Sequence, residues 1–226
     1  METIRARVKS FAILETLLER NLSTYYRGVS SASKHKLITK VGRNCECEHS
    51  ELASLEEFML KKFQKSAILH LDYRPEDQWE WLSIAQHHGM PTRLLDWTTN
   101  PLVAAYFACA KHPNENGAIY LLSEFSGLPK IDTKKETPFD IKNVSLFEPA
   151  NISKRLTSQN GIFTVHPNPT VEWKSDSIRI LIIDNQAKRK ILNALKKRGI
   201  HEASLFQDLD GLARFLGDEI LERRKL

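Results

Sequence analysis

Hydrophobic positions near the start of the chain recur at three- and four-residue steps, as they do on one face of a helix. The residues in this pattern are Ile4, Val8, Phe11, Leu14 and Leu18. We therefore predict an amphipathic helix as the first element. The β-prone residues 24–26 come next and lead into Arg27-Gly28 and a serine-rich patch at 30–33, which predicts a short strand ending in a polar turn.

A capping-box pattern marks the second predicted helix. Ser54 precedes Glu57 by three residues, an arrangement in which each side chain bonds the other's backbone N–H. The apolar side of this helix consists of Leu55, Met59 and Phe63. We expect the helix to begin near Ser54.

Two more helices have clear ends. The third has an apolar face of Trp79, Leu82 and Ala85. It should end near residues 89–91, because glycine favours the left-handed turn there and proline cannot continue a helix. Asn100 and Pro101 suit the N-cap and first position of a fourth helix. Its uncharged residues 102–109 predict that it is buried.

The second half of the chain changes character. Residues 118–122 and 178–183 are candidates for buried strands, and the proline-containing stretch 129–169 between them is predicted to be rich in loops. Helices are predicted at 187–198 and 208–226, the last with a basic end. The pattern indicates an α+β fold with helices concentrated in the N-terminal half and a C-terminal helix. We expect a single domain over residues 1–226.

Composition narrows the class of protein. The chain has 226 residues, of which 41% are hydrophobic, and a formal net charge of +5. These values are typical of a globular protein and exclude wholesale disorder. No stretch reaches the roughly 18 apolar residues of a spanning helix, so no membrane partner is expected. Three cysteines cannot pair completely, and we find no secretory signal. A cytoplasmic location is therefore expected.

The densest group of polar and aromatic residues is 86–101, between the third and fourth predicted helices. A connection that contains His87, Arg93, Asp96 and Trp97 is costly to bury unless these groups bond each other or a ligand. One explanation is structural, with Arg93 paired to Asp96. The other is a binding site.

This run resembles the signature of the FRG domain family. The similar residues are Trp81-Leu82, the run 86–98, Asn100-Pro101 and the run 105–108. The family takes its name from a Phe/Tyr-Arg-Gly motif, which Tyr26-Arg27-Gly28 matches, and residues 155–164 are similar to its third block. The resemblance covers 22–183, with 1–20 as a helical lead and 184–226 as a helical extension.

The resemblance implies an ADP-ribosyltransferase-like split sheet and an NAD-utilising enzyme. Such an enzyme cleaves the bond between nicotinamide and ribose and passes ADP-ribose to a macromolecule or to water. A toxin or antiviral (phage defence) role would follow by analogy. By this resemblance, the residues expected to bind NAD are Tyr26, Arg27, Gly28, His87, Thr92, Arg93 and Trp97. Those expected to be catalytic are Arg27, Asp96, Thr98 and Gln159.

Each residue type suits its expected role. A guanidinium at Arg27 can hold a pyrophosphate through two hydrogen bonds. Trp97 or Tyr26 could stack on a ring, and His87 could accept a proton near neutral pH. Gln159 stands where the fold usually has a catalytic glutamate, and an amide supplies no negative charge to an oxocarbenium-like transition state. Asp96 is an alternative source of that charge, as are Glu148 and Glu172.

Other functions stay open. The same pocket could belong to a non-catalytic module that binds a nucleotide or nucleic acid, which the basic helix at 187–198 would favour. The polar run could also be a purely structural network around Trp97. Cys45, Cys47 and His49 are potential zinc ligands, but their spacing is tighter than in a usual zinc site and no second pair follows, so no metal is expected.

Overall fold

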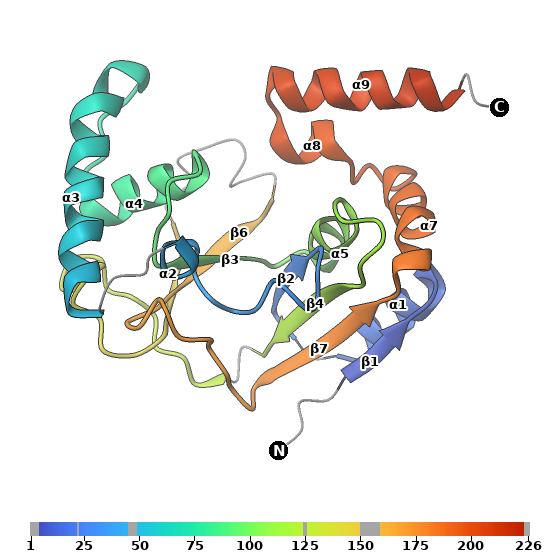
Figure 1. Ribbon diagram of the computed structural model, residues 1–226, viewed down its shortest axis with the longest axis horizontal. Coiled ribbons are helices and arrows are strands. Elements are labelled where there is room, and N and C mark those ends of the chain that lie inside the picture. The colour runs from blue at the N-terminus through green and yellow to red at the C-terminus, as the bar shows by residue number, and fades with distance from the viewer. Residues whose placement is uncertain (1–4, 22, 45–48, 124–125, 150–158, 224–226) are drawn as a thin grey trace.

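The computed structural model describes residues 5–21, 23–44, 49–123, 126–149 and 159–223 (Figure 1). The fold is α+β, as predicted, with a seven-stranded mixed sheet in the order β1-β7-β4-β2-β3-β6-β5. The strands are β1 (Arg5–Val8), β2 (Tyr25–Val29), β3 (Leu94–Thr98), β4 (Gly117–Leu122), β5 (Ser145–Phe147), β6 (Gly161–Val165) and β7 (Ile178–Ile183). The outer pair β1 and β7 is parallel, and the other neighbours are antiparallel.

The helices lie before, between and after these strands. They are α1 (Phe11–Glu19), α2 (Lys40–Asn44), α3 (His49–Ala67), the 3₁₀ turn η1 (Ile68–His70), α4 (Gln78–His87), α5 (Pro101–Cys109), α7 (Asn185–Lys196), α8 (Glu202–Phe206) and α9 (Leu209–Arg223). Figure 1 shows α3 and α4 at one end of the molecule and α7, α8 and α9 at the other. Across the described ranges, no helix combines the length and apolar character needed to cross a membrane.

The sheet consists of two halves that meet at one point. In the described part of the chain, β2 and β3 share one registered pair, Tyr26 opposite Thr98. By contrast, β2 pairs with β4 from Tyr25 to Val29, and β3 pairs with β6 from Leu94 to Thr98. The halves β1-β7-β4-β2 and β3-β6-β5 therefore separate beyond this pair.

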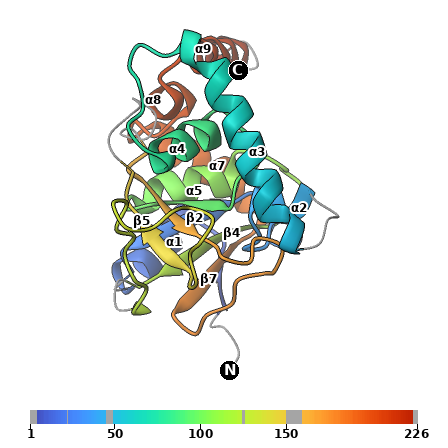
Figure 2. The same ribbon diagram turned by 90° about the vertical axis from the view of Figure 1, so that its left-hand side faces the viewer.

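Different helices cover the two halves. Apolar residues of α1, α5 and α7 pack on the half that contains β4 and β7, whereas those of α3 and α4 pack on the half that contains β6. A third cluster lies on the opposite face and includes residues from both halves. Figure 2 shows α4, α5 and α7 on the same side of the strands. The point where β2 and β3 separate therefore lies beneath α4 and α5.

The best-marked helices are confirmed. Asn100 caps α5 by accepting a hydrogen bond from the Leu102 N–H at 2.9 Å, and Pro101 is the first helical residue. Helix α4 ends before Gly89, which has a φ of 87° that favours glycine. Strands β4 and β7 and helices α7 and α9 also lie where the hydrophobic pattern predicts them.

The predicted first helix is wrong in its first half. Arg5–Val8 forms the edge strand β1, which pairs with Ile180–Ile183 of β7. Helix α1 begins only after Ser10, whose hydroxyl oxygen accepts a hydrogen bond from the Ile13 N–H at 3.3 Å. Pairing with a strand far along the sequence overrides the helical spacing of Ile4 and Val8, because those contacts are not local.

The predicted start and face of the second helix are also wrong. Helix α3 begins at His49, so Ser54 lies inside it. Its buried face includes Leu52, Glu56 and Leu60, whereas the Leu55 side of the predicted face is 41% exposed. The hydrophobic pattern treated Glu56 as a solvent-facing residue, but Glu56 is buried with a partner on another element.

Residues 129–169 contain more regular structure than predicted. Strands β5 and β6 lie within this stretch and complete one edge of the sheet. Helix α8 was not predicted either, since it has only five residues. Among the residues of the third family block, 155–158 lie outside the described part of the chain.

Candidate functional site

A pocket of about 670 Å³ opens where β2 and β3 separate. We call it the candidate pocket. It is lined by Tyr26, Arg27, Gly28, Lys40, Gln86, His87, His88, Gly89, Asp96, Trp97, Thr98, Val103, Phe107, Gln159 and Asp208. The structure thus brings together eight of the residues predicted from the sequence. Thr92 and Arg93, also predicted, are buried behind this wall.

Arg27 bridges the gap between the two halves of the sheet. Its Nη1 atom donates a hydrogen bond to the backbone oxygen of Asp96 at 2.6 Å and lies 3.4 Å from Asp96 Oδ2. The Arg27 side chain is 14% exposed, and within the described structure its buried Nε has no hydrogen-bond partner. A guanidinium held by one edge, with an N–H still unused, can take an anionic ligand.

Asp96 is held in the pocket by an amide. Gln86 Nε2 lies 3.1 Å from both carboxylate oxygens of Asp96. The orientation of this amide is fixed because the hydroxyl of Thr92 donates to Gln86 Oε1 at 2.6 Å. The Asp96 side chain remains 60% exposed. The chain Thr92–Gln86–Asp96 therefore presents a positioned carboxylate to whatever occupies the pocket.

Gly28 allows a helix to approach the sheet. A Cβ at this position would lie 1.8 Å from the backbone oxygen of Ala104 in α5. No side chain fits in that space, so α5 packs directly on β2. This contact explains the glycine of the Tyr26-Arg27-Gly28 motif through packing, whatever ligand its backbone also meets.

Thr98 and Gln159 connect the end of β3 to neighbouring segments. The Thr98 hydroxyl donates to the backbone oxygen of Gln159 at 2.6 Å and accepts from the Asn100 N–H at 3.0 Å. The Gln159 amide donates to the backbone oxygen of Leu205 in α8 at 3.1 Å. Both residues line the pocket, but these polar groups already have protein partners.

The two predicted stacking residues are nearly covered. Trp97 is 2% exposed, and its indole N–H donates to Thr164 Oγ1 at 2.9 Å. Tyr26 is 6% exposed, and its hydroxyl donates to the Ser23 backbone oxygen. Burial raises the pKa of this phenol. Their burial favours a core role. Phe107 is half-buried on the α5 side and is better placed to meet an aromatic ligand.

Arg93 pairs with α3 and not with Asp96. Its Nη2 lies 2.6 Å from Glu56 Oε2, its Nε lies 3.2 Å from both carboxylate oxygens, and both side chains are 2% exposed. The structural alternative of an Arg93–Asp96 pair is therefore wrong. Side chains three residues apart on an extended strand point to opposite faces, so the two groups cannot meet.

Sequence reasoning missed several residues of the site. Gln86 stood within the family signature but carries no charge, so nothing marked it as the partner of Asp96. Lys40 donates to the Gly89 backbone oxygen at 2.5 Å and joins the wall from a distant segment. Phe107 was hidden in an apolar helix pattern. Only the family signature gave a signal for Gln86 and Phe107, and none pointed to Lys40.

Metal binding has no support in the described ranges, where no group of three or more His, Cys, Asp or Glu side chains is placed to hold an ion. Cys45 and Cys47 lie outside those ranges. Cys109 is buried, and desolvation raises its pKa to about 12, so its thiol stays protonated and unreactive.

Comparison with known proteins identifies one domain. Residues 23–117 match the family model of the FRG domain. This range contains both halves of the meeting point, Tyr26 and Thr98, together with Gln86 and Asp96. No curated protein and no solved structure matches the chain. The family predicted from the motifs is thereby confirmed, and the chain contains an FRG domain.

Proposed function

We propose that the candidate pocket binds NAD and cleaves its nicotinamide–ribose bond, with ADP-ribose passing to an acceptor or to water. The observation that carries the proposal is the convergence of Arg27 and the positioned carboxylate of Asp96 at the point where the sheet separates. One pair joins the two halves, which supports the finer architecture, an ADP-ribosyltransferase-like split sheet. A volume of about 670 Å³ is within the range of pockets that bury a nucleotide-sized ligand.

The roles follow from charge. Arg27 would hold a phosphate or ribose oxygen of NAD through its remaining N–H groups. When the bond breaks, nicotinamide leaves with the bonding electrons and the ribose becomes cationic at C1′. Asp96 is the carboxylate best placed to stabilise that cation, because Gln86 holds it and it stays exposed to the pocket. The oxygen or nitrogen of the acceptor then bonds to C1′ and releases its proton, for which His87 is a candidate base.

This assignment moves the negative charge from the third family block to β3. Gln159 cannot supply charge, and its amide is bound to Leu205. Asp96, on the neighbouring strand segment, lies in the same pocket. The missing glutamate therefore does not argue against bond cleavage as strongly as the sequence alone suggested.

The test measures nicotinamide released from NAD by the purified chain. We expect release by the wild type and a loss of at least about 100-fold in Asp96→Asn and Arg27→Ala. Asp72→Asn, an exposed carboxylate away from the pocket, is the matched control and should keep full activity. No release, with NAD binding still detected by calorimetry, would overturn cleavage and leave a nucleotide-binding module. Neither release nor binding would make the polar network architectural.

A further inference from the structure

A second pocket, of about 920 Å³, shares a wall with the candidate pocket. We call it the basic pocket. Arg27, Gly28 and Phe107 line both pockets, so a ligand in one lies next to a ligand in the other. The basic pocket is not needed to hold NAD in the proposal above. It is placed where the acceptor of ADP-ribose would have to approach.

Cationic side chains dominate the basic pocket. Arg43, Lys111 and Arg214 line it together with Arg27. Its one lining carboxylate, among the described residues, is Glu202, which is paired with Arg214. Arg43 and Lys111 are exposed and make no ion pair within the described structure. Their charges are therefore available to an anion.

The charges in this pocket act on one another. Desolvation and then the charge of Arg27 lower the pKa of Arg43. Burial lowers the pKa of His35, and the neighbouring charges of His112, Arg43 and Arg27 lower it further. These effects show that several cations are crowded together without a matching anion, an arrangement that a bound phosphate would stabilise.

Aromatic side chains alternate with these cations in space. Tyr106, Phe107 and Phe206 line the same pocket and are half-buried. The rings of Phe107 and Phe206 lie 6.2 Å apart in an edge-to-face arrangement. Cations that track a phosphate backbone, next to aromatic rings that accept unstacked bases, are the features of single-strand nucleic-acid sites. An acidic peptide would use the cations but not the rings.

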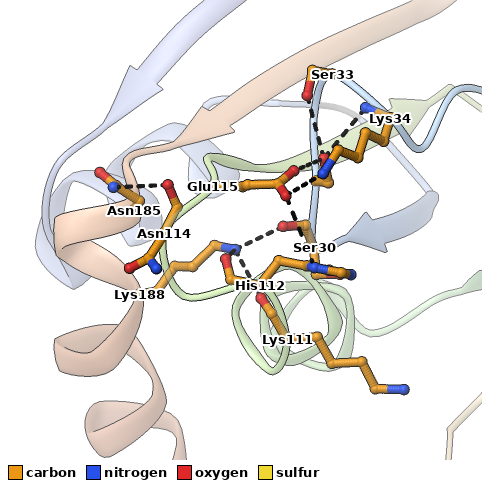
Figure 3. Close-up of polar contacts among 10 residues, drawn as sticks. Ser30, Ser33, Lys34, Lys111, His112, Asn114, Glu115, Asn185 and Lys188 are labelled. Carbon is orange, nitrogen blue, oxygen red and sulfur yellow. Dashed lines mark hydrogen bonds and ion pairs between the residues drawn. The ribbon is translucent and has the colours of Figure 1, made fainter.

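The wall of the basic pocket is fixed from behind by a buried lysine (Figure 3). Lys188 is 2% exposed, and its Nζ donates to the backbone oxygens of Ser30, Lys111 and His112 at 2.7, 3.0 and 2.9 Å. The ammonium ties the end of β2 to the residues that follow α5. The backbones of two lining residues, Ser30 and Lys111, are therefore held in place before any ligand binds.

We propose that the basic pocket binds single-stranded nucleic acid as the acceptor, with phosphates on Arg43 and Lys111 and a base against Phe107. This inference rests on the proposed function, because it names the acceptor of the ADP-ribose released there. The acceptor atom bonds to C1′ as nicotinamide leaves with the bonding electrons, and the proton of the acceptor passes to solvent or to His87.

Binding is tested first without NAD, by fluorescence anisotropy of labelled short single-stranded DNA and RNA. Arg43→Ala/Lys111→Ala should weaken binding at least about 10-fold and reduce the slope of log affinity against log salt by about 2. Arg189→Ala/Lys197→Ala removes the same charge from exposed positions of α7 and is the matched control. It should change affinity less than about 2-fold. An equal loss in both double variants would overturn the proposal, since net charge alone would then explain binding.

Two further arms separate the sources of phosphate and the class of polymer. Calorimetry with NAD should give the same affinity for the wild type and Arg43→Ala/Lys111→Ala. A comparable loss of NAD affinity would assign these cations to NAD and overturn the acceptor site. A polyglutamate peptide should compete poorly with the single strand, and equal competition would overturn recognition of nucleic acid.

The last arm joins binding to chemistry. With NAD present, the mass of the bound oligonucleotide should increase by one ADP-ribose in the wild type. Nicotinamide release to water with an unmodified, bound oligonucleotide would overturn the acceptor assignment and leave the proposed function intact. Absence of nicotinamide release with bound oligonucleotide would refute the proposed function instead, so the two failures are distinguishable.

Discussion

Two arginine–carboxylate pairs lie close together in this molecule and differ in almost every physical respect. Arg93 and Glu56 are each 2% exposed and make three contacts of 2.6 to 3.2 Å. Arg27 and Asp96 are 14% and 60% exposed and lie 3.4 Å apart. The first pair has its hydrogen bonds satisfied within the protein. The second leaves a carboxylate and an N–H facing a pocket.

The difference teaches which charged residues of a polar motif serve stability and which serve a ligand. A buried, bidentate pair is costly to break, because the partner left behind keeps a desolvated charge. An exposed pair contributes little to stability, since water screens it. Arg93 stands three residues before Asp96, so proximity in sequence does not predict which role a residue has.

The largest expected effect is on the buried pair. Glu56→Gln should destabilise the protein by about 3–5 kcal/mol, because Arg93 would keep its charge without a partner in the core. Urea unfolding measures the loss. The control is Glu57→Gln, which removes a carboxylate 3.5 Å from Lys61 on the same helix, both side chains being well exposed. Its cost should stay below about 0.5 kcal/mol. A loss under about 1 kcal/mol for Glu56→Gln would remove the contrast between the pairs.

The exposed pair should show the opposite result. Asp96→Asn should lower the rate of nicotinamide release at least about 100-fold, close to 2.7 kcal/mol of transition-state stabilisation. Its free energy of unfolding should change by less than about 1 kcal/mol. Release and urea unfolding are measured on the same preparations. A large stability loss in Asp96→Asn would mean that this pair, like Arg93–Glu56, is architectural.

His166 tests the environment that both arginines share. It is 2% exposed, and its Nε2 lies 2.9 Å from Thr164 Oγ1. Burial, then Arg27 and Arg93, lowers its pKa to about 3. The folded protein therefore keeps this imidazole neutral while the unfolded chain takes up a proton below pH ~6.5. Stability is fully present above that pH and should fall by about 2 kcal/mol from pH 7 to pH 5.

The check is urea unfolding across that pH range in the wild type and in His166→Gln. The variant should lose most of the slope between pH 7 and pH 5. A smaller slope should remain, because the pKa of His35 is also lowered and contributes with the same sign. An unchanged slope in His166→Gln would assign the acid sensitivity to other groups.

The smallest expected effect lies behind the exposed pair. Thr92→Val removes the hydroxyl that orients the Gln86 amide, and should lower nicotinamide release about 10-fold, or roughly 1.4 kcal/mol. In the Asp96→Asn background the same change should have almost no further effect, because Gln86 then has no carboxylate to position. Additive losses in the double variant would show that Thr92 acts through stability and not through Asp96.

Local signals in the sequence were sufficient for the central helices. Asn100-Pro101 and Gly89 set the ends of α5 and α4 through hydrogen bonds and backbone conformations within a few residues. Strand β4 follows from a continuous apolar run. The family motifs also selected most of the candidate pocket, since Tyr26-Arg27-Gly28 and the run 86–98 supply its walls.

The tertiary structure decided what depends on partners far apart in the chain. Arg5–Val8 is a strand because β7 lies beside it, and Glu56 is buried because Arg93 reaches α3. Likewise, the pocket exists because β2 and β3 share one pair and then separate. The sequence by itself determined the local elements and the family, because those depend on near neighbours. The choice of partners, and so the division between structural and ligand-facing charges, depends on burial, which only the packed chain defines.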